Sequence, residues 1–306
     1  MFTRAIVRPP SANFASGLTS VDLGQPNYEL ALEQHEAYCR ALEDCGLSLI
    51  RMEADDRYPD STFVEDTAVV TARGFVMTQP GAPSRLGEIE GVDEVLHNFF
   101  RFYYAIHGEG RLDGGDVCEA GDHFFIGVSR RTNEEGAAQL AEFLDTMGYG
   151  STLIDIRSLG NILHLKSGLA FLGGKRLGGV ESSEDAFSRD RGRLACTERE
   201  ARKTSVAGET PAVPGKSIRK TEHDYRLAVI DELKDLKPFS GYDLIRVNAA
   251  EAYAANCLWV NGRVLLAKGY PDFQRQLQEL GYETVTLEIS EFQKMDGGLS
   301  CLSLRF

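Results

Sequence analysis

The sequence has little cysteine, no excess of positive charge and no long apolar run. Its formal net charge of −13 over 306 residues argues against a nucleic-acid partner, because no basic surface would offset phosphate repulsion. Six scattered cysteines, without a CxxC pair or a zinc-type Cys/His spacing, are too few for a disulfide framework. No stretch approaches the roughly 18 apolar residues of a membrane span, and residues 1–8 alternate like a short strand rather than a signal peptide. We therefore expect a soluble, cytoplasmic protein with reduced thiols and no membrane or nucleic-acid partner.

The composition, 42% hydrophobic and 26% charged residues, is that of an ordinary globular protein. Apolar spacing and turn residues predict strands that alternate with helices. We expect helices over 28–45, from 83 to near 99, after a Thr132/Glu135 capping box, and over 271–280. The expected strands are 47–52, 62–71, 74–78, 116–119, 123–128, 153–156, 162–165, 169–172, 255–261, 263–267, 284–287 and the C-terminal residues. Strand–strand–helix–strand units recur roughly every 50–60 residues, which suits a propeller-like ring of α/β modules or a two-layer α+β domain.

Residues 175–222 interrupt this order. They hold eleven Lys/Arg and eight Asp/Glu but few large apolar side chains, too few to bury a core of their own. A polar, flexible surface insertion is the favoured interpretation; a functional lid and a translated intron are the alternatives. We therefore predict one domain over 1–306 with an insertion at 175–222.

Near the C-terminus, Cys301 follows Asp296-Gly297-Gly298-Leu299-Ser300. The two glycines allow a tight turn beside the thiol, and the flanking apolar residues hold down a terminus that would otherwise fray. An acid five residues upstream could hold a cation against the sulfur. This pattern indicates a nucleophile at the rim of a pocket, with a buried structural cysteine as the alternative.

Other polar residues are ambiguous when each is taken alone. Asp113-Gly114-Gly115-Asp116 is typical of a hairpin turn. His164 lies in an apolar segment that predicts a strand, where a lone histidine is more often part of the core. Glu65 and Asp66 come directly after apolar strand residues and could be solvated or line a pocket for a cation. Arg85 and Arg131 would separately be ordinary surface arginines.

The set is more informative than its members. Acids surround a guanidinium, arginines bind a carboxylate in a bidentate manner, and cysteine with histidine performs nucleophilic substitution. The implied substrate carries a guanidinium at one end and an α-carboxylate at the other, which describes arginine or a derivative of it.

With these motifs in order, the sequence resembles the dimethylarginine dimethylaminohydrolase family. The resemblance covers roughly residues 1–174 and 223–306 and rests on these motifs: Phe63-Val64-Glu65-Asp66, Leu112-Asp113-Gly114-Gly115-Asp116-Val117, Phe125–Ser129 with Arg131-Thr132-Asn133, Leu163-His164-Leu165-Lys166-Ser167, Ala254-Ala255-Asn256-Cys257 and Asp296–Cys301. It implies an α+β fold, the five-bladed α/β propeller of guanidine-modifying enzymes around a central active-site channel.

The resemblance also implies a role for each matching residue. Cys301 matches the nucleophile, His164 the general acid/base, and Asp113 the acid that orients the histidine, where some relatives have Glu. The matching substrate-binding residues are Asp66 and Asp296 for the guanidinium with Glu65 at the same end, Arg85 and Arg131 for the carboxylate, Leu18 in a covering loop, Asp60 near the α-amine, and Met295 beside Asp296. No metal or organic cofactor is implied, and a homodimer is compatible with the resemblance.

The implied reaction converts Nω-methylated arginine and water to citrulline and methylamine or dimethylamine through a covalent thiouronium on cysteine. An arginine deiminase-type hydrolase of unmethylated arginine would use the same catalytic group. A decarboxylated substrate such as agmatine is disfavoured, because Arg85 and Arg131 would then have no carboxylate to bind. A non-catalytic binding protein on the same scaffold is the alternative from another class, and the retained Cys, His and acids argue against it.

Overall fold

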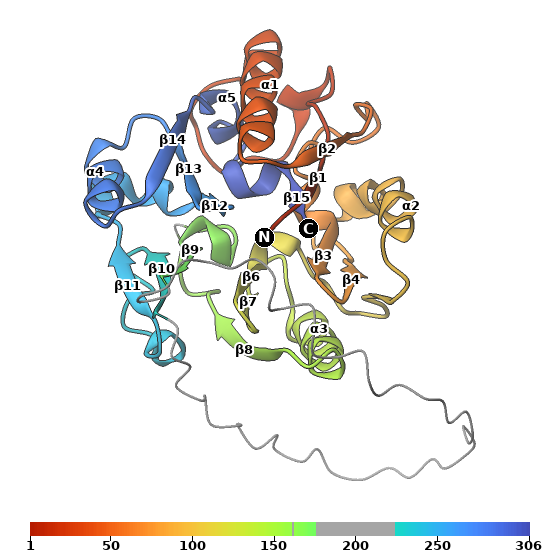
Figure 1. The fold of residues 1–306 in the computed structure, drawn as a ribbon. Coiled ribbons are helices and arrows are strands. Elements are labelled where there is room, and N and C mark those ends of the chain that lie inside the picture. Colours follow the sequence, from red (N-terminus) through yellow and green to blue (C-terminus); the bar gives the residue numbers. More distant parts are fainter. Residues whose placement is uncertain (161, 176–223) are drawn as a thin grey trace. The chain divides into compact units, whose positions relative to one another are not determined.

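The computed structural model describes residues 1–160, 162–175 and 224–306 (Figure 1). Its compact unit comprises Met1–Gly174 and Tyr225–Phe306. Apart from residue 175, the predicted insertion lies outside the described residues. Within the described part of the chain, no helix combines the length and the apolar composition needed to cross a bilayer.

The described residues form five sheets of three strands each, with one pattern repeated. Where both pairings are recorded, the middle strand is antiparallel to one neighbour and parallel to the other. In chain order the sheets are β15 (Leu304–Arg305), β1 (Arg4–Val7) and β2 (Ser48–Arg51); β3 (Ala68–Thr71), β4 (Gly74–Met77) and β5 (Tyr103–Ala105); β6 (Val117–Ala120), β7 (His123–Val128) and β8 (Gly150–Asp155); β9 (Leu169–Lys175), β10 (Asp224–Val229) and β11 (Asp243–Arg246); and β12 (Leu258–Val260), β13 (Arg263–Ala267) and β14 (Glu283–Leu287).

Helical segments connect the parallel strands, because a parallel pair needs a crossover rather than a tight turn. In chain order they are α1 (Tyr28–Asp44), η3 (Pro83–Ile89) with α2 (Val92–His97), α3 (Glu134–Thr146), η6 (Lys237–Phe239) and α4 (Pro271–Glu279). Further short helices lie in the loops: η1 (Phe14–Ser16), η2 (Val64–Thr67), η4 (Gly114–Asp116), η5 (Leu165–Ser167), η7 (Ala249–Ala255), α5 (Ser290–Gln293) and η8 (Leu299–Leu302). The predicted residues of the site lie mostly in or beside this second group.

Four apolar clusters join each sheet to the next. From the first–second junction to the fifth–first junction, buried members are Ile6 with Phe75; Val76 with Ile126; Phe125 with Leu227 and Leu266; and Leu265 with Val7. The last described strand, β15, also pairs with β1, with Ala5 opposite Arg305. The last described strand therefore completes the first sheet, which shares apolar clusters with the second and the fifth.

The prediction of a strand over Ile162–Leu165 is wrong. His164 instead directly precedes the 3-10 helix η5. The Leu165 N–H donates to Asp116 Oδ1 at 2.9 Å rather than to a neighbouring strand. Because this bond joins residues far apart in the sequence, no local pattern announces it.

Other predicted boundaries shift for similar reasons. The capping box is wrong: Asn133 is the N-cap of α3 and accepts from the Gly136 N–H at 2.8 Å, while Thr132 Oγ1 accepts from the Asp113 N–H. The expected strand 62–71 begins as η2, and the expected strand 255–261 is reduced to β12 by η7. The helix expected from 83 to near 99 divides into η3 and α2 at Gly91, which has φ +36°.

Candidate active site

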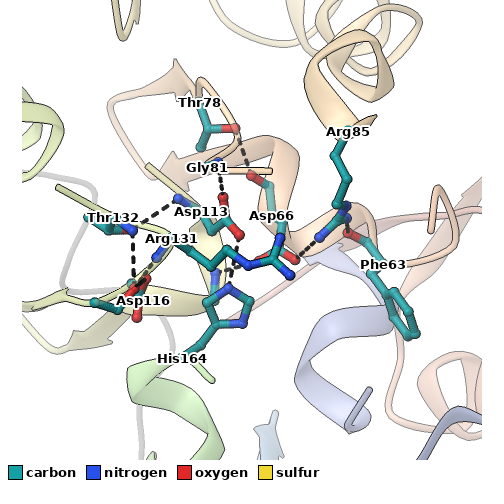
Figure 2. Close-up of polar contacts among 12 residues, drawn as sticks. Phe63, Asp66, Thr78, Gly81, Arg85, Asp113, Asp116, Arg131, Thr132 and His164 are labelled. Carbon is teal, nitrogen blue, oxygen red and sulfur yellow. Dashed lines mark hydrogen bonds and ion pairs between the residues drawn. The ribbon is translucent and has the colours of Figure 1, made fainter. Parts of the chain in front are cut away.

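His164 and Asp113 form a buried pair at the centre of the site. The His164 Nε2 lies 2.9 Å from Asp113 Oδ2 (Figure 2). The other carboxylate oxygen of Asp113 accepts from the Gly81 N–H at 2.7 Å, and the Asp113 N–H donates to Thr132 Oγ1 at 3.1 Å. Both oxygens of Asp113 are therefore fixed, so the carboxylate can hold the orientation of the imidazole.

The charge state of His164 is set by the acids around it. Burial lowers its pKa, but the charge of Asp66, the hydrogen bond that the imidazole donates to Asp113 and the charge of Asp116 together raise it to about 9. Asp116 itself accepts from Ser129 Oγ at 2.7 Å, and burial raises its pKa to about 6 despite the nearby histidine. His164 is consequently protonated at neutral pH and surrounded by carboxylates.

Asp66 links the histidine cluster to Arg85. Its Oδ1 accepts from the Gly115 N–H at 2.8 Å, and its Oδ2 is 2.6 Å from Arg85 Nη1. Burial favours the neutral acid, but the positive charges of His164 and Arg85 outweigh it and hold the pKa of Asp66 well below its usual range. Gly115 allows this close packing, since a Cβ there would lie 2.8 Å from the imidazole and 2.9 Å from Asp66 Oδ1.

The two predicted clamp arginines differ in their contacts. Arg85 is buried, and besides Asp66 it donates to Glu88 Oε2 through Nε at 3.0 Å and Nη2 at 2.7 Å. Burial raises the pKa of Glu88 to about 7, although the arginine opposes this. By contrast, the buried Nη1 of Arg131 has no hydrogen-bond partner among the described residues. Figure 2 shows the Arg131 side chain extending toward Asp66 and His164.

Cys301 lies in η8, after a turn in which positions 297 and 298 have no room for a Cβ. Its N–H donates to the Gly298 carbonyl at 3.1 Å. Asp296 adopts a left-handed conformation with φ 56°, and a Cβ at Gly297 would lie 2.3 Å from the ring of Phe63. Burial, followed by the charges of Glu65 and Asp66, raises the pKa of the Cys301 thiol to about 12. Without a bound cation the sulfur is therefore a neutral thiol.

Glu65 connects the cysteine segment to the histidine segment. Its Oε2 accepts from Ser300 Oγ at 2.8 Å, and its Oε1 lies 2.6 Å from Lys166 Nζ and 3.2 Å from Arg305 Nη2. The carboxylate is buried, and both of its oxygens are engaged. Lys166 follows His164 by two residues and Ser300 directly precedes Cys301, so one acid contacts both segments.

Two residues of the N-terminal segment, the predicted Leu18 and the neighbouring Ser20, donate to two of the predicted acids. Asp296 Oδ2 accepts from the Ser20 N–H at 2.5 Å, and Asp60 Oδ1 accepts from the Leu18 N–H at 3.0 Å. Met295 is buried in the core shared by the first and fifth sheets. A cavity of about 450 Å³ lies beside the Cys301 turn; its lining includes Ser20, Ser129, Asn256, Asp296, Gly297 and Gly298.

Three side chains of the histidine cluster, Asp66, Asp113 and His164, carry atoms that could bind a metal ion. The ligand atoms of Asp66, Asp113 and His164 all lie within 4.8 Å of one another. However, Asp66 already pairs with the Arg85 guanidinium, and Asp113 with His164. A metal ion would therefore have to compete with a cation that the chain itself supplies.

The structure brings His164, Asp113, Asp66, Arg85 and Arg131 into one cluster (Figure 2). The sequence reasoning gave no role to four further residues of the site: Asp116, Glu88, Lys166 and Asn256. Three of these stood inside the quoted motifs, which was the available signal. Glu88 had only its spacing from Arg85, three residues earlier on a predicted helix.

Comparison with known proteins defines the class. A family model described as Arginine deiminase matches residues 54–305. The dimethylarginine dimethylaminohydrolase of Pseudomonas aeruginosa is 36% identical over the full length of both chains, and that of Streptomyces coelicolor is 30% identical over 99% of this chain and 96% of its own. A structure of a P. aeruginosa enzyme variant complexed with citrulline superposes with a TM-score of 0.81 at 35% identity, covering both chains completely.

The match defines the class as hydrolases of the arginine deiminase type, acting on C–N bonds. Within that class, the chain belongs to the dimethylarginine dimethylaminohydrolase family.

Proposed function

We propose that the chain hydrolyses Nω-methylated arginine to citrulline and methylamine or dimethylamine. The observation that carries this proposal is the buried cluster of Asp66, Asp113 and His164 beside the Cys301 turn, in a chain that matches a named dimethylarginine dimethylaminohydrolase from end to end. The solved P. aeruginosa relative is complexed with citrulline, the product expected here. Acids suit a guanidinium cation, and a thiol suits attack on its carbon.

Activation of the thiol follows from its surroundings. Burial and two carboxylates raise the pKa of Cys301 to about 12, so the free enzyme holds it protonated. A guanidinium bound against Glu65, Asp66 and Asp296 would neutralise that negative field and favour the thiolate, with release of the thiol proton to solvent. The substrate would then activate its own nucleophile.

The reaction proceeds in two stages. The thiolate attacks the guanidinium carbon and forms a C–S bond; the C–N bond to the methylated amine breaks, and protonated His164 gives its proton to that amine. The product of this stage is a covalent thiouronium. His164, now neutral, takes a proton from water, whose oxygen adds to the same carbon while the C–S bond breaks. The proton left on the added oxygen passes to the departing sulfur, which restores the thiol as citrulline leaves. Asp113 keeps the imidazole oriented through both stages.

The other end of the substrate would bind near the N-terminal segment. Arg131 offers an unpartnered Nη1 for the α-carboxylate, whereas Arg85 must share its guanidinium with Asp66 and Glu88. Leu18, Asp60 and Met295 would surround the α-amine. The contact of Leu18 with Asp60 supports this assignment, since it places the segment 17–20 against an acid.

We also propose that the five sheets form the five-bladed propeller implied by the sequence. The apolar clusters shared by consecutive sheets and the pairing of β15 with β1 support a closed ring. A cytoplasmic location and a homodimer stay predictions; light scattering of the purified protein tests the second.

Replacement of the nucleophile tests the function directly. Cys301→Ser should lower turnover of dimethylarginine by at least about 10³-fold, because a serine hydroxyl is far less acidic than a thiol, while calorimetry still detects substrate binding. Cys45→Ser is the matched control, since Cys45 directly follows α1 and lies in the apolar cluster shared by the first and fifth sheets. Citrulline formed by Cys301→Ser at the wild-type rate would refute the assignment.

A second candidate, hydrolysis of unmethylated arginine, is favoured by the description of the matching family model. The same purified enzyme separates the two. Release of dimethylamine from dimethylarginine supports the first proposal, and preferential release of ammonia from arginine supports the second. Binding of either compound without turnover would indicate a non-catalytic protein.

A further inference from the structure

Asn256 contacts both catalytic segments with one side chain. It directly follows η7 and is 7% exposed. Its Nδ2 donates to the Lys166 carbonyl at 3.1 Å, and its Oδ1 accepts from the Ser300 N–H at 3.0 Å. Lys166 lies two residues after His164, and Ser300 directly precedes Cys301. The carboxamide therefore links the segment that follows His164 to the segment that precedes Cys301.

We propose that Asn256 is a positioning residue that fixes the Cys301 segment relative to the His164 segment. The inference rests on the proposed hydrolase function. In the proposed reaction the sulfur attacks the guanidinium carbon and the imidazole protonates the leaving amine, so both groups must reach the same bound guanidinium. Small displacements of reacting groups lower the rate strongly. Asn256 sets that relation through two backbone groups rather than through the reacting atoms.

The packing of Asn256 explains why glycine occupies position 298. A Cβ on Gly298 would lie 2.4 Å from Asn256 Cγ and 2.5 Å from Oδ1. The Gly298 carbonyl in turn accepts the Cys301 N–H at 3.1 Å. The carboxamide thus lies against the turn on which the thiol is held, and the adjacent Tyr253 hydroxyl donates to the Gly297 carbonyl at 2.6 Å.

Glu65 joins the same two segments by a different route. It binds the side chains of Ser300 and Lys166, whereas Asn256 binds their backbones. Glu65 also carries a charge that raises the pKa of the nearby thiol. Asn256 is neutral, so its removal should alter geometry and leave the titration of the site in place. This difference makes Asn256 the cleaner residue to test.

The test compares Asn256→Ala with Asn248→Ala. Asn248 is the N-cap of the same η7 segment, is exposed, and accepts from the Ala250 N–H at 3.1 Å. Steady-state kinetics with dimethylarginine, thermal unfolding and the pH dependence of Cys301 alkylation by iodoacetamide are measured for both. We expect Asn256→Ala to lower kcat by about 10- to 100-fold, to keep KM within about threefold, and to leave the alkylation midpoint unmoved. Asn248→Ala should keep the wild-type kcat.

A kcat for Asn256→Ala within about twofold of the wild type would overturn the positioning role. So would an equal loss of kcat in Asn248→Ala, or an alkylation midpoint displaced by more than about one pH unit, since these indicate a general structural or an electrostatic effect. If Asn256→Ala does not fold, Asn256→Asp replaces it: it keeps an acceptor for Ser300 but loses the donor to Lys166, and an unchanged kcat overturns the role. An inactive wild type would instead overturn the proposed function.

Discussion

Among the described residues two histidines are buried, and their surroundings differ. His35 on α1 is 4% exposed and His164 beside η5 is 6% exposed. His35 packs against Phe292, and its Nε2 has no hydrogen-bond partner among the described residues. Burial, with a smaller effect of Arg51, lowers its pKa to about 4, whereas the acids around His164 raise that pKa to about 9. Burial alone thus makes a neutral core residue, and the surrounding carboxylates make a buried proton donor.

The same substitution at both positions tests this difference most directly. His164→Gln should lower kcat by about 10²- to 10⁴-fold, the usual contribution of a general acid/base. His35→Gln should keep kcat within about threefold and lower the free energy of unfolding by about 1–2 kcal/mol, because an amide replaces a ring packed in the core. Citrulline assays and urea unfolding measure the two effects. Comparable loss of kcat in both variants would show that the distinction is wrong.

The next test concerns Asp113, the acid that is hydrogen-bonded to His164. Asp113→Asn should lower kcat by about 10²-fold or more, because an amide no longer favours the protonated, correctly oriented imidazole. NMR titration should show the His164 pKa moving down from about 9. His35, which lies on α1 against Phe292, should titrate as in the wild type. An unshifted His164 pKa would mean that Asp66 and Asp116 suffice without Asp113.

The smallest expected effect is on the pH dependence of stability. The folded-state pKa of His164 lies above the unfolded value of about 6.5; its stabilising contribution is complete below that pH and is lost as pH rises through about 9. The folded-state pKa of His35 lies below the unfolded value, so stability falls as pH drops from about 6.5 toward 4. Urea unfolding across this range should show that His164→Gln removes the alkaline dependence and His35→Gln the corresponding acid one. Unaltered profiles in both variants would contradict the two pKa directions.

Local patterns predicted some parts of this molecule well. The helix expected over 28–45 is α1, and β6 and β7 correspond to the strands expected over 116–119 and 123–128. The helix over 271–280 is α4. These elements depend on periodicity and turn residues close to one another in the chain. The repeat of strand–strand–helix–strand units likewise predicted the common pattern of the sheets.

The site was predictable in composition but not in local structure. His164, Asp113, Asp66, Arg85 and Arg131 were identified as a set and lie together. Several of them, and Cys301, lie in or beside 3-10 segments that were missed, since backbone groups there bond to distant side chains such as Asp116 and Asn256. The contacts of Glu65 with Lys166 and Arg305 join three parts of the chain that no short window includes.

The pairing of β1 with β15 has a consequence for folding. The partner of β1, Leu304–Arg305, follows Cys301 by three residues. Between the two paired strands the sequence holds the other four sheets. A contact between residues so far apart closes a very long loop, which makes its formation slow. We therefore expect the turn that holds the thiol to be fixed late in folding, when β15 joins the first sheet.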